Sequence, residues 1–161
     1  MTDLNQTQER EALDQLLNRL LGAFEEKMPF NKLLGLKIES LHLEEVRLRI
    51  DMRDELIGNF VHGILHGGVI ASVLDVAGGM IAIANAFHTK PQLTEAERMQ
   101  GIDKSGTIDM RVDYLRPGRG EYFIATAQVL RSGRKVSVTR MELHNNEGVL
   151  IAVGTGSYIV G

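Results

Sequence analysis

A histidine and two glycines, His66-Gly67-Gly68, stand directly before a long apolar stretch of the chain. If a helix begins there, its first turn presents backbone N–H groups that have no partner within the helix, together with the positive end of the helix dipole. Glycine also lets a ligand approach the backbone closely. The segment could therefore stabilise a developing oxyanion, such as the carbonyl oxygen of a thioester attacked by water. Alternatively, Gly67 and Gly68 only permit tight packing of the helix.

Asp75 is the only ionisable residue between Gly67 and Phe87. A lone carboxylate among apolar side chains is costly unless it is paired or has a chemical role. A general base or a nucleophile would be such a role. A buried salt bridge to an arginine of a neighbouring strand is the alternative.

The distance between these two features carries a further prediction. Gly67 and Asp75 are eight residues apart, about 12 Å along a helix axis. A base must come within about 3 Å of its water, and that water must reach the carbon whose oxygen sits at Gly67. One copy of the helix can hardly do both. The spacing therefore predicts a dimer in which the helix start of one subunit faces Asp75 of the other.

The composition narrows the possible functions. A length of 161 residues and a net charge of −3 predict one globular domain without a basic surface for nucleic acid or an anionic membrane. The lack of cysteine excludes disulfides, thiolate zinc sites and cysteine nucleophiles. His62 and His66 flank Gly63 and have no third ligand, so no metal site is predicted. The polar residues 1–11 do not resemble a signal peptide, and the cytoplasm is the expected compartment.

The first part of the chain should place one helix and two strands before His66. Apolar residues at three- and four-residue spacing predict an amphipathic helix over residues 8–27, which Met28-Pro29 ends. One more turn over 30–36 would be closed by Gly35. Alternation around Ile38 and over 46–52 predicts a hairpin, and residues 56–65 are expected to form a loop.

The stretch from Gly67 to Phe87 is apolar all round and long enough to span a membrane. The aspartate within it, its glycines and the absence of basic residues at its ends argue against insertion. A fully buried core helix has the same composition. We therefore predict a core helix and no membrane insertion.

The rest of the chain predicts a short excursion and four strands. Residues 88–106 are polar, and Thr94 with Glu97 fits a capping box for a short helix. Alternating runs follow, and turns rich in glycine and asparagine join them. They cover residues 108–114, 123–129, 136–143 (with a break in register) and 150–159. The chain is thus α+β, with an antiparallel sheet of about six strands wrapped around one long helix. We divide it into an extension, 1–27, and a domain, 28–161.

Two stretches resemble a known family. GILHGGVIASVLDVAGG is similar to the His-Gly-Gly…Asp motif of PaaI-type hotdog thioesterases, and TIDMRVDYLRPGRGE is similar to that family's strand and Tyr-x-x-Pro turn. The likeness covers about residues 28–160 and is strongest for the YigI-like branch. It implies the hotdog fold and hydrolysis of medium- to long-chain acyl-CoA in fatty acid metabolism. Coenzyme A is part of the substrate and no other cofactor is implied.

The resemblance also implies roles for single residues. Asp75 matches the catalytic carboxylate, and Gly67 matches the backbone donor of the oxyanion hole. His66 matches the motif histidine, which orients the loop and the thioester, and Thr107 falls where relatives hold the attacking water. Gly68 is expected to contact the substrate. The family builds its site across a two-fold interface, which implies a homodimer or a dimer of dimers.

One position departs from the family pattern. Relatives often carry an asparagine six residues before the motif histidine, where this chain has Phe60, and the asparagine is its neighbour Asn59. Either the loop shifts by one residue or the polar contact is lost.

Basic residues gather at two predicted turns and could bind the phosphates of coenzyme A, although a solvated turn surface is the alternative. They are Arg116, Arg119, Arg131, Arg134 and Lys135.

Two other functions compete with hydrolysis. A hotdog dehydratase or hydratase would use a paired histidine and carboxylate, for which His66 and Asp75 could be mistaken. A non-catalytic acyl-CoA-binding sensor would carry a helix-turn-helix, whereas residues 1–27 predict one helix with balanced charge.

Overall fold

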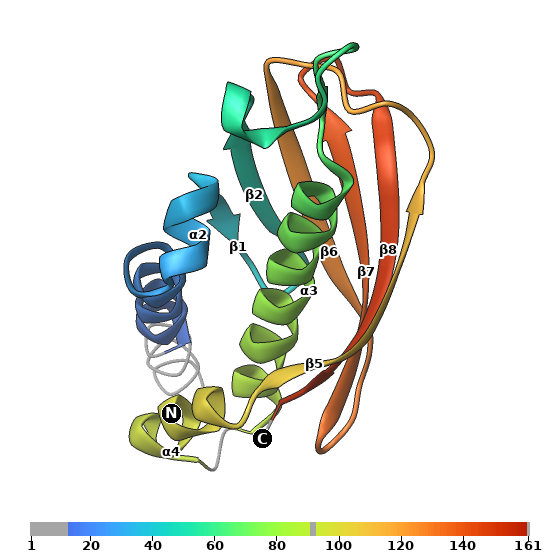
Figure 1. The fold of residues 1–161 in the computed structure, drawn as a ribbon. Coiled ribbons are helices and arrows are strands. Elements are labelled where there is room, and N and C mark those ends of the chain that lie inside the picture. Colours follow the sequence, from blue (N-terminus) through green and yellow to red (C-terminus); the bar gives the residue numbers. More distant parts are fainter. Residues whose placement is uncertain (1–12, 91–92, 161) are drawn as a thin grey trace.

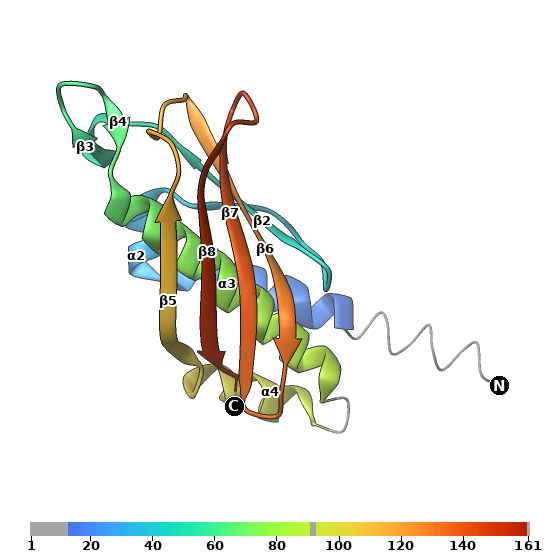
Figure 2. The ribbon, with the colours of Figure 1, turned by 90° about the vertical axis from the view of Figure 1, so that its right-hand side faces the viewer.

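The computed structural model describes residues 13–90 and 93–160. Six antiparallel strands form one sheet in the order β1-β2-β6-β7-β8-β5. The sheet curves around the long helix α3, and residues 13–34 lie on the opposite side of α3 (Figures 1 and 2). The sheet strands are β1 (Lys37–Leu41), β2 (Val46–Asp51), β5 (Gly106–Tyr114), β6 (Tyr122–Ser132), β7 (Val136–Asn145) and β8 (Leu150–Ile159).

The N-terminal helix packs onto the core. Residues 13–22 are helical and continue into a π-helical turn, η1 (Ala23–Lys27). The predicted amphipathic pattern is confirmed in the described part of this helix. Its apolar face is buried in one cluster with residues of the sheet, and that face consists of Leu16, Leu17, Leu20 and Phe24. The predicted end at Met28-Pro29 and the extra turn are also confirmed. The turn is α2 (Pro29–Leu34), and Gly35 closes it with a left-handed φ of 68°.

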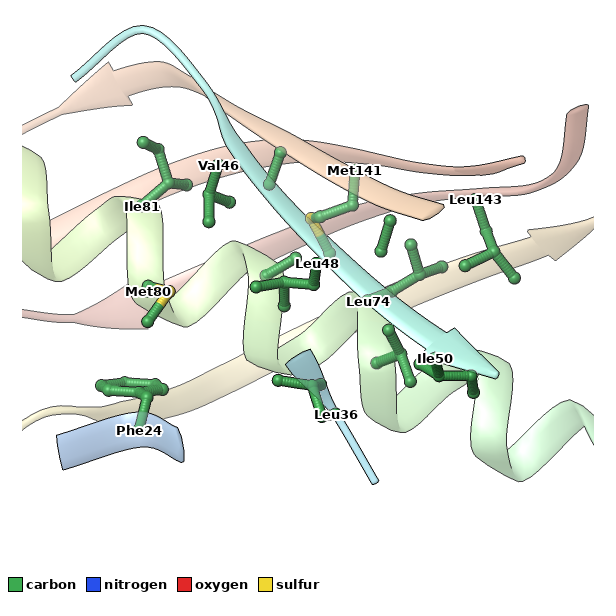
Figure 3. Close-up of a cluster of buried hydrophobic side chains, with 14 of the residues drawn as sticks. Phe24, Leu36, Val46, Leu48, Ile50, Leu74, Met80, Ile81, Met141 and Leu143 are labelled. Carbon is green, nitrogen blue, oxygen red and sulfur yellow. The ribbon is translucent and has the colours of Figure 1, made fainter. Parts of the chain in front are cut away.

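Helix α3 (Gly67–Thr89) is the centre of the fold. It begins at Gly67, as predicted, and its inward side chains meet those of β2, β6 and β7 (Figure 3). Among the described residues it is the one helix long and apolar enough to cross a membrane. Within the protein, 56% of the 18-residue apolar stretch that makes it so is buried. Its all-round apolar surface is explained by cover on both sides, from the sheet and from the N-terminal helix.

The predicted register break in β7 is wrong. The strand runs without interruption, and its inward positions are taken by Ser137, Thr139, Met141 and Leu143. Two small polar residues therefore face the core where the valines were expected. The reason is space, because Tyr158 and the turn of α3 at Gly78 lie against this part of the strand, and Thr139 Oγ1 is 2.8 Å from where a Cβ of Gly78 would stand. The irregularities lie in the two neighbouring strands instead, in β6 between Val129 and Arg131 and in β8 between Leu150 and Ala152.

The segment expected to be a loop before the helix contains two short strands. A 3₁₀ turn, η2 (Asp54–Leu56), leads into β3 (Ile57–Asn59), which pairs with β4 (Ile64–Leu65). Glycine is required at position 58, because a Cβ there would lie 2.7 Å from the His66 Cα. The hairpin extends beyond the end of the sheet (Figure 2).

The short helix predicted in the excursion is present as α4 (Glu95–Asp103). Its capping box is complete, since Thr94 Oγ1 accepts from Glu97 N at 3.3 Å and the Glu97 carboxylate accepts from Thr94 N at 2.8 Å. The helix lies beside the C-terminal half of α3 (Figure 1).

Candidate active site

A carboxylate and a hydroxyl from distant parts of the chain meet beside α3. Thr107 Oγ1 donates a hydrogen bond of 2.8 Å to Asp75 Oδ1. Asp75 lies on the third turn of α3 and is partly exposed, and Thr107 is the second residue of β5. Pairing of β5 with β8 brings Thr107 opposite Tyr158, which itself contacts α3. The sheet thus unites two residues that are 32 positions apart.

These two residues open into an apolar cavity of about 380 Å³. Asp75 and Thr107 lie in its wall together with Val76, Gly79 and Ile83 of α3. Side chains of the N-terminal segment close the opposite side, namely Phe24, Met28, Pro29 and Phe30. A carboxylate at the wall of an apolar cavity can activate water against a substrate whose hydrocarbon part is buried alongside.

Tyr158 supports the turn of α3 that carries Asp75. Its side chain is 2% exposed, and its hydroxyl donates to the backbone carbonyl of Asp75 at 3.3 Å. Burial and the negative charge of Asp75 raise the pKa of this phenol far above its ordinary value, so Tyr158 stays a neutral donor. The tyrosine therefore holds the backbone beneath the carboxylate.

His66 caps the start of α3. Its Nδ1 accepts from Gly68 N at 2.8 Å, so the neutral imidazole carries its proton on Nε2. Val69 N and Ile70 N donate to the His66 carbonyl at 2.9 and 3.1 Å. Gly67 N–H makes no hydrogen bond to any described residue. It is the donor of the first turn that is open to a ligand, whereas Gly68 N–H is already engaged.

The two stretches that resemble thioesterases contact each other at this helix start. Tyr114 OH donates to the Gly67 carbonyl at 3.0 Å. Leu65 N donates to the Gly118 carbonyl at 2.9 Å, which joins β4 to the Pro117-Gly118 turn. The end of β5 and the turn after it therefore fix the backbone that presents Gly67 N–H.

The helix start and the carboxylate stay apart within one chain. The residues His66 to Gly68 are absent from the wall of the Asp75 cavity. Across the described ranges, Asp75 forms no ion pair, so the buried salt bridge considered as its alternative is not found there. His66 and Asp75 do not form a pair in one chain either. In the part of the chain that the structure describes, no group of acidic or histidine side chains could hold a metal.

In the loop before the histidine, the Asn59 side chain closes a turn and Phe60 is exposed. Asn59 Oδ1 accepts from Val61 N at 3.0 Å and from His62 N at 3.2 Å, so its side chain closes the β3–β4 turn. Phe60 is 89% exposed at the tip and Val61 is 71% exposed. Neither Asn59 nor Phe60 contacts the Asp75 cavity of the same chain.

The basic residues do not form one cluster. Arg116 and Arg119 lie at the end of the sheet that holds the start of α3, where Arg116 donates to the Leu150 carbonyl and Arg119 to the His62 carbonyl. Arg131, Arg134 and Lys135 lie at the β6–β7 turn, at the opposite end (Figure 1). The 11 residues of β6 separate the two ends by about 35 Å.

Two residues of this region carried no predicted role. Tyr114 lies within the Tyr-x-x-Pro stretch, but its contact with Gly67 depends on how β5 runs beside α3. Tyr158 could be assigned from the sequence only to the inward face of an alternating strand. Its contact with Asp75 spans 83 positions, and no local pattern predicts it.

The cap at His66 gives a testable difference between two variants. His66→Ala is expected to lower the free energy of unfolding by about 1 kcal/mol, because Gly68 N–H loses its acceptor. His66→Asn should stay near the wild type, since asparagine is a good N-cap. Urea unfolding of the three proteins measures this. Equal stability of the alanine and asparagine variants would contradict the capping role.

Comparison with known proteins places this chain among thioesterases. The family model described as "Thioesterase superfamily" matches residues 62–152. The chain is 45% identical over 148 residues to the medium/long-chain acyl-CoA thioesterase YigI of Escherichia coli K12. The aligned region covers 92% of this chain and 96% of that protein. A crystal structure of a Shewanella oneidensis protein related to the thioesterase superfamily is 49% identical and has a TM-score of 0.90, covering 93% of this chain and 98% of that one. The E. coli PaaI protein shares the fold alone, at 21% identity and a TM-score of 0.74, with 92% and 96% covered.

Proposed function

Because this chain belongs to the thioesterase superfamily, we propose that it hydrolyses its substrates at the Asp75–Thr107 pair. The chain has the hotdog fold of that family and is an acyl-CoA thioesterase, which converts an acyl-CoA and water to a fatty acid and free coenzyme A. The observation that carries the proposed site is the carboxylate–hydroxyl pair at the wall of an apolar cavity of about 380 Å³.

The proposed mechanism uses Asp75 as general base. Its carboxylate takes a proton from water, and the Thr107 hydroxyl, which donates to Asp75, accepts from that water through its lone pairs. The water oxygen bonds to the thioester carbon, and the carbonyl oxygen gains negative charge that Gly67 N–H stabilises. The C–S bond then breaks, and the coenzyme A sulfur receives the proton. His66 Nε2–H is free to donate to the same carbonyl.

The second half of the site is proposed to come from a partner subunit. The strand β5 is at the edge of the sheet, and most of its side chains are exposed. Its beginning carries Thr107 beside Asp75, and its end carries Tyr114 beside Gly67. When two such edges pair antiparallel about a two-fold axis, the beginning of each strand lies beside the end of the other. Asp75 of one subunit then faces the partner's Gly67.

We also propose the substrate range and the setting. The apolar cavity and the likeness to the E. coli medium/long-chain enzyme favour medium- to long-chain acyl groups. Arg131, Arg134 and Lys135, or Arg116 at the other end, are proposed to bind the phosphates of coenzyme A across the dimer. The reaction needs water as its second reactant and no further cofactor. Its proposed compartment is the cytoplasm.

The direct test is release of free thiol from a series of acyl-CoA substrates. The chain contains no cysteine, so a thiol reagent meets no protein background. We expect turnover of octanoyl- to palmitoyl-CoA, and sedimentation should give a dimer or a dimer of dimers. Absence of hydrolysis across the series, with dehydration of 3-hydroxyacyl-CoA instead, would favour the dehydratase. A fully active monomer would contradict the shared site.

A further inference from the structure

A second cavity of about 240 Å³ lies next to the Asp75 cavity. Ile83 of α3 and Ser105 after α4 stand in the walls of both. We propose, on the basis of the thioesterase function above, that the second cavity is the distal compartment of the acyl site. Medium-chain groups fill only the first compartment, and long-chain groups reach past Ile83 into the second.

One face of α3 lines both compartments without interruption. The first cavity meets Asp75, Val76, Gly79 and Ile83, and the second meets Ile83, Ala86, Phe87 and Lys90. Asp75, Gly79, Ile83, Phe87 and Lys90 follow one another at three- and four-residue steps, which places them along one side of the helix, and Val76 and Ala86 stand beside them. A chain that leaves the carbonyl at Asp75 along this face therefore arrives at Ile83 and then at the second cavity.

The helix also gives the approximate capacity of each compartment. Asp75 to Ile83 covers eight residues, about 12 Å, and Ile83 to Lys90 covers seven more, about 10 Å. An extended chain advances roughly 1.2 Å per bond, by analogy with a peptide that spans about 3.5 Å for three bonds. The first compartment thus holds about ten carbons and both together about eighteen.

The second compartment is lined by both apolar and polar side chains. The apolar part comes from α3, Leu93 and Val160, and the polar part includes Lys90, Glu97, Arg98, Gln100 and Lys104. Two of the charged ends are held by protein partners, since Lys90 Nζ donates to the Val160 carbonyl at 3.2 Å and the Glu97 carboxylate accepts from Thr94. Their methylene stems can line a hydrocarbon chain while the charged ends stay in polar contact.

Helix α4 offers a position from which the second compartment can be filled. Gly101 stands in its wall, and a Cβ built there meets no atom within 4 Å. Its φ is not positive, so a side chain causes no backbone strain. Gly101→Phe is therefore expected to occupy the second cavity and to leave the first cavity and Asp75 unchanged. Gly101→Ala is the matched control, because its methyl group takes up little of the space.

The experiment compares kcat/KM for octanoyl-CoA and palmitoyl-CoA in the wild type and both variants. Gly101→Phe should lower the palmitoyl value by about tenfold or more, because several methylenes lose their buried contact. It should change the octanoyl value less than about twofold, and Gly101→Ala should keep the wild-type ratio. A palmitoyl/octanoyl ratio unaltered in Gly101→Phe, or an equal loss for both substrates, would overturn the proposal.

A reciprocal variant separates this compartment from the first. Gly106 lines the Asp75 cavity, and a Cβ there also meets no atom within 4 Å. Gly106→Leu is expected to lower the values for both substrates, whereas loss for palmitoyl-CoA alone would contradict the order of the compartments. If the wild type hydrolyses neither substrate, the proposed function fails, independently of the chain-length inference.

Discussion

Asp75→Asn is expected to lower kcat/KM for acyl-CoA hydrolysis by about 10²–10⁴-fold, because the amide cannot take a proton from water. The fold should be retained. Asparagine has the same shape, and its side-chain oxygen can accept the hydrogen bond from Thr107 that the carboxylate accepts. The measurement is thiol release under identical conditions for the wild type and the variant.

The matched control for this experiment is Asp14→Asn. Asp14 is an exposed carboxylate on the N-terminal helix and lines neither cavity. Its replacement removes the same charge and should leave the rate unchanged. Thermal unfolding of both variants checks that the structure is intact. If Asp75→Asn keeps wild-type activity, the assignment of Asp75 as the general base is wrong.

Gly67→Pro is expected to lower kcat by about 10²–10³-fold, because proline has no N–H to stabilise the oxyanion. Proline suits this place in other respects. Gly67 is the first residue of α3, where proline is favoured, and His66 has the extended backbone, with ψ of 134°, that a residue before proline adopts. The variant should therefore fold while its donor is missing.

Gly67→Ala separates the lost donor from the added bulk. A Cβ at this position comes within 3.3 Å of the Tyr114 ring in both variants, but alanine keeps the N–H. The Gly67→Ala variant should therefore be much more active than the Gly67→Pro variant. Similar loss in the two variants would mean that crowding against Tyr114, and not the donor, accounts for the effect.

The same two substitutions test whether the site is shared. Mixed and reassembled subunits of Asp75→Asn and Gly67→Pro form heterodimers in which one site carries both changes and the other carries neither. Random reassembly of equal amounts should restore about a quarter of the wild-type rate. Each homodimer alone stays inactive. A mixture as inactive as its components would show that both residues act within one chain.

The elements of the fold follow from patterns between near neighbours, and the sequence predicted them well. The start of α3 at Gly67, the turn closed by Gly35 and the capping box at Thr94 depend on residues within four positions of each other. Backbone hydrogen bonds and caps act over that range, so the local sequence is sufficient to predict these features. The inward face of β7 depended on its neighbours in space, and there the alternation of valines was misleading.

For the candidate site, the sequence by itself determined which groups could do the chemistry. A carboxylate in an apolar helix and a glycine at its start are recognisable without coordinates, and their separation already predicted two subunits. Thr107 was named only through a family resemblance. The structure brings it to Asp75 because β5 pairs with β8 at the edge of the sheet.

Only the tertiary structure decided what surrounds these groups. The order of the strands set Tyr158 beneath Asp75 and separated the basic residues to opposite ends of the sheet. The N-terminal helix and α4 built the cavities along α3. These contacts join residues tens of positions apart. Their formation depends on how the whole chain packs, and the spacing of residue types along the sequence does not predict that packing.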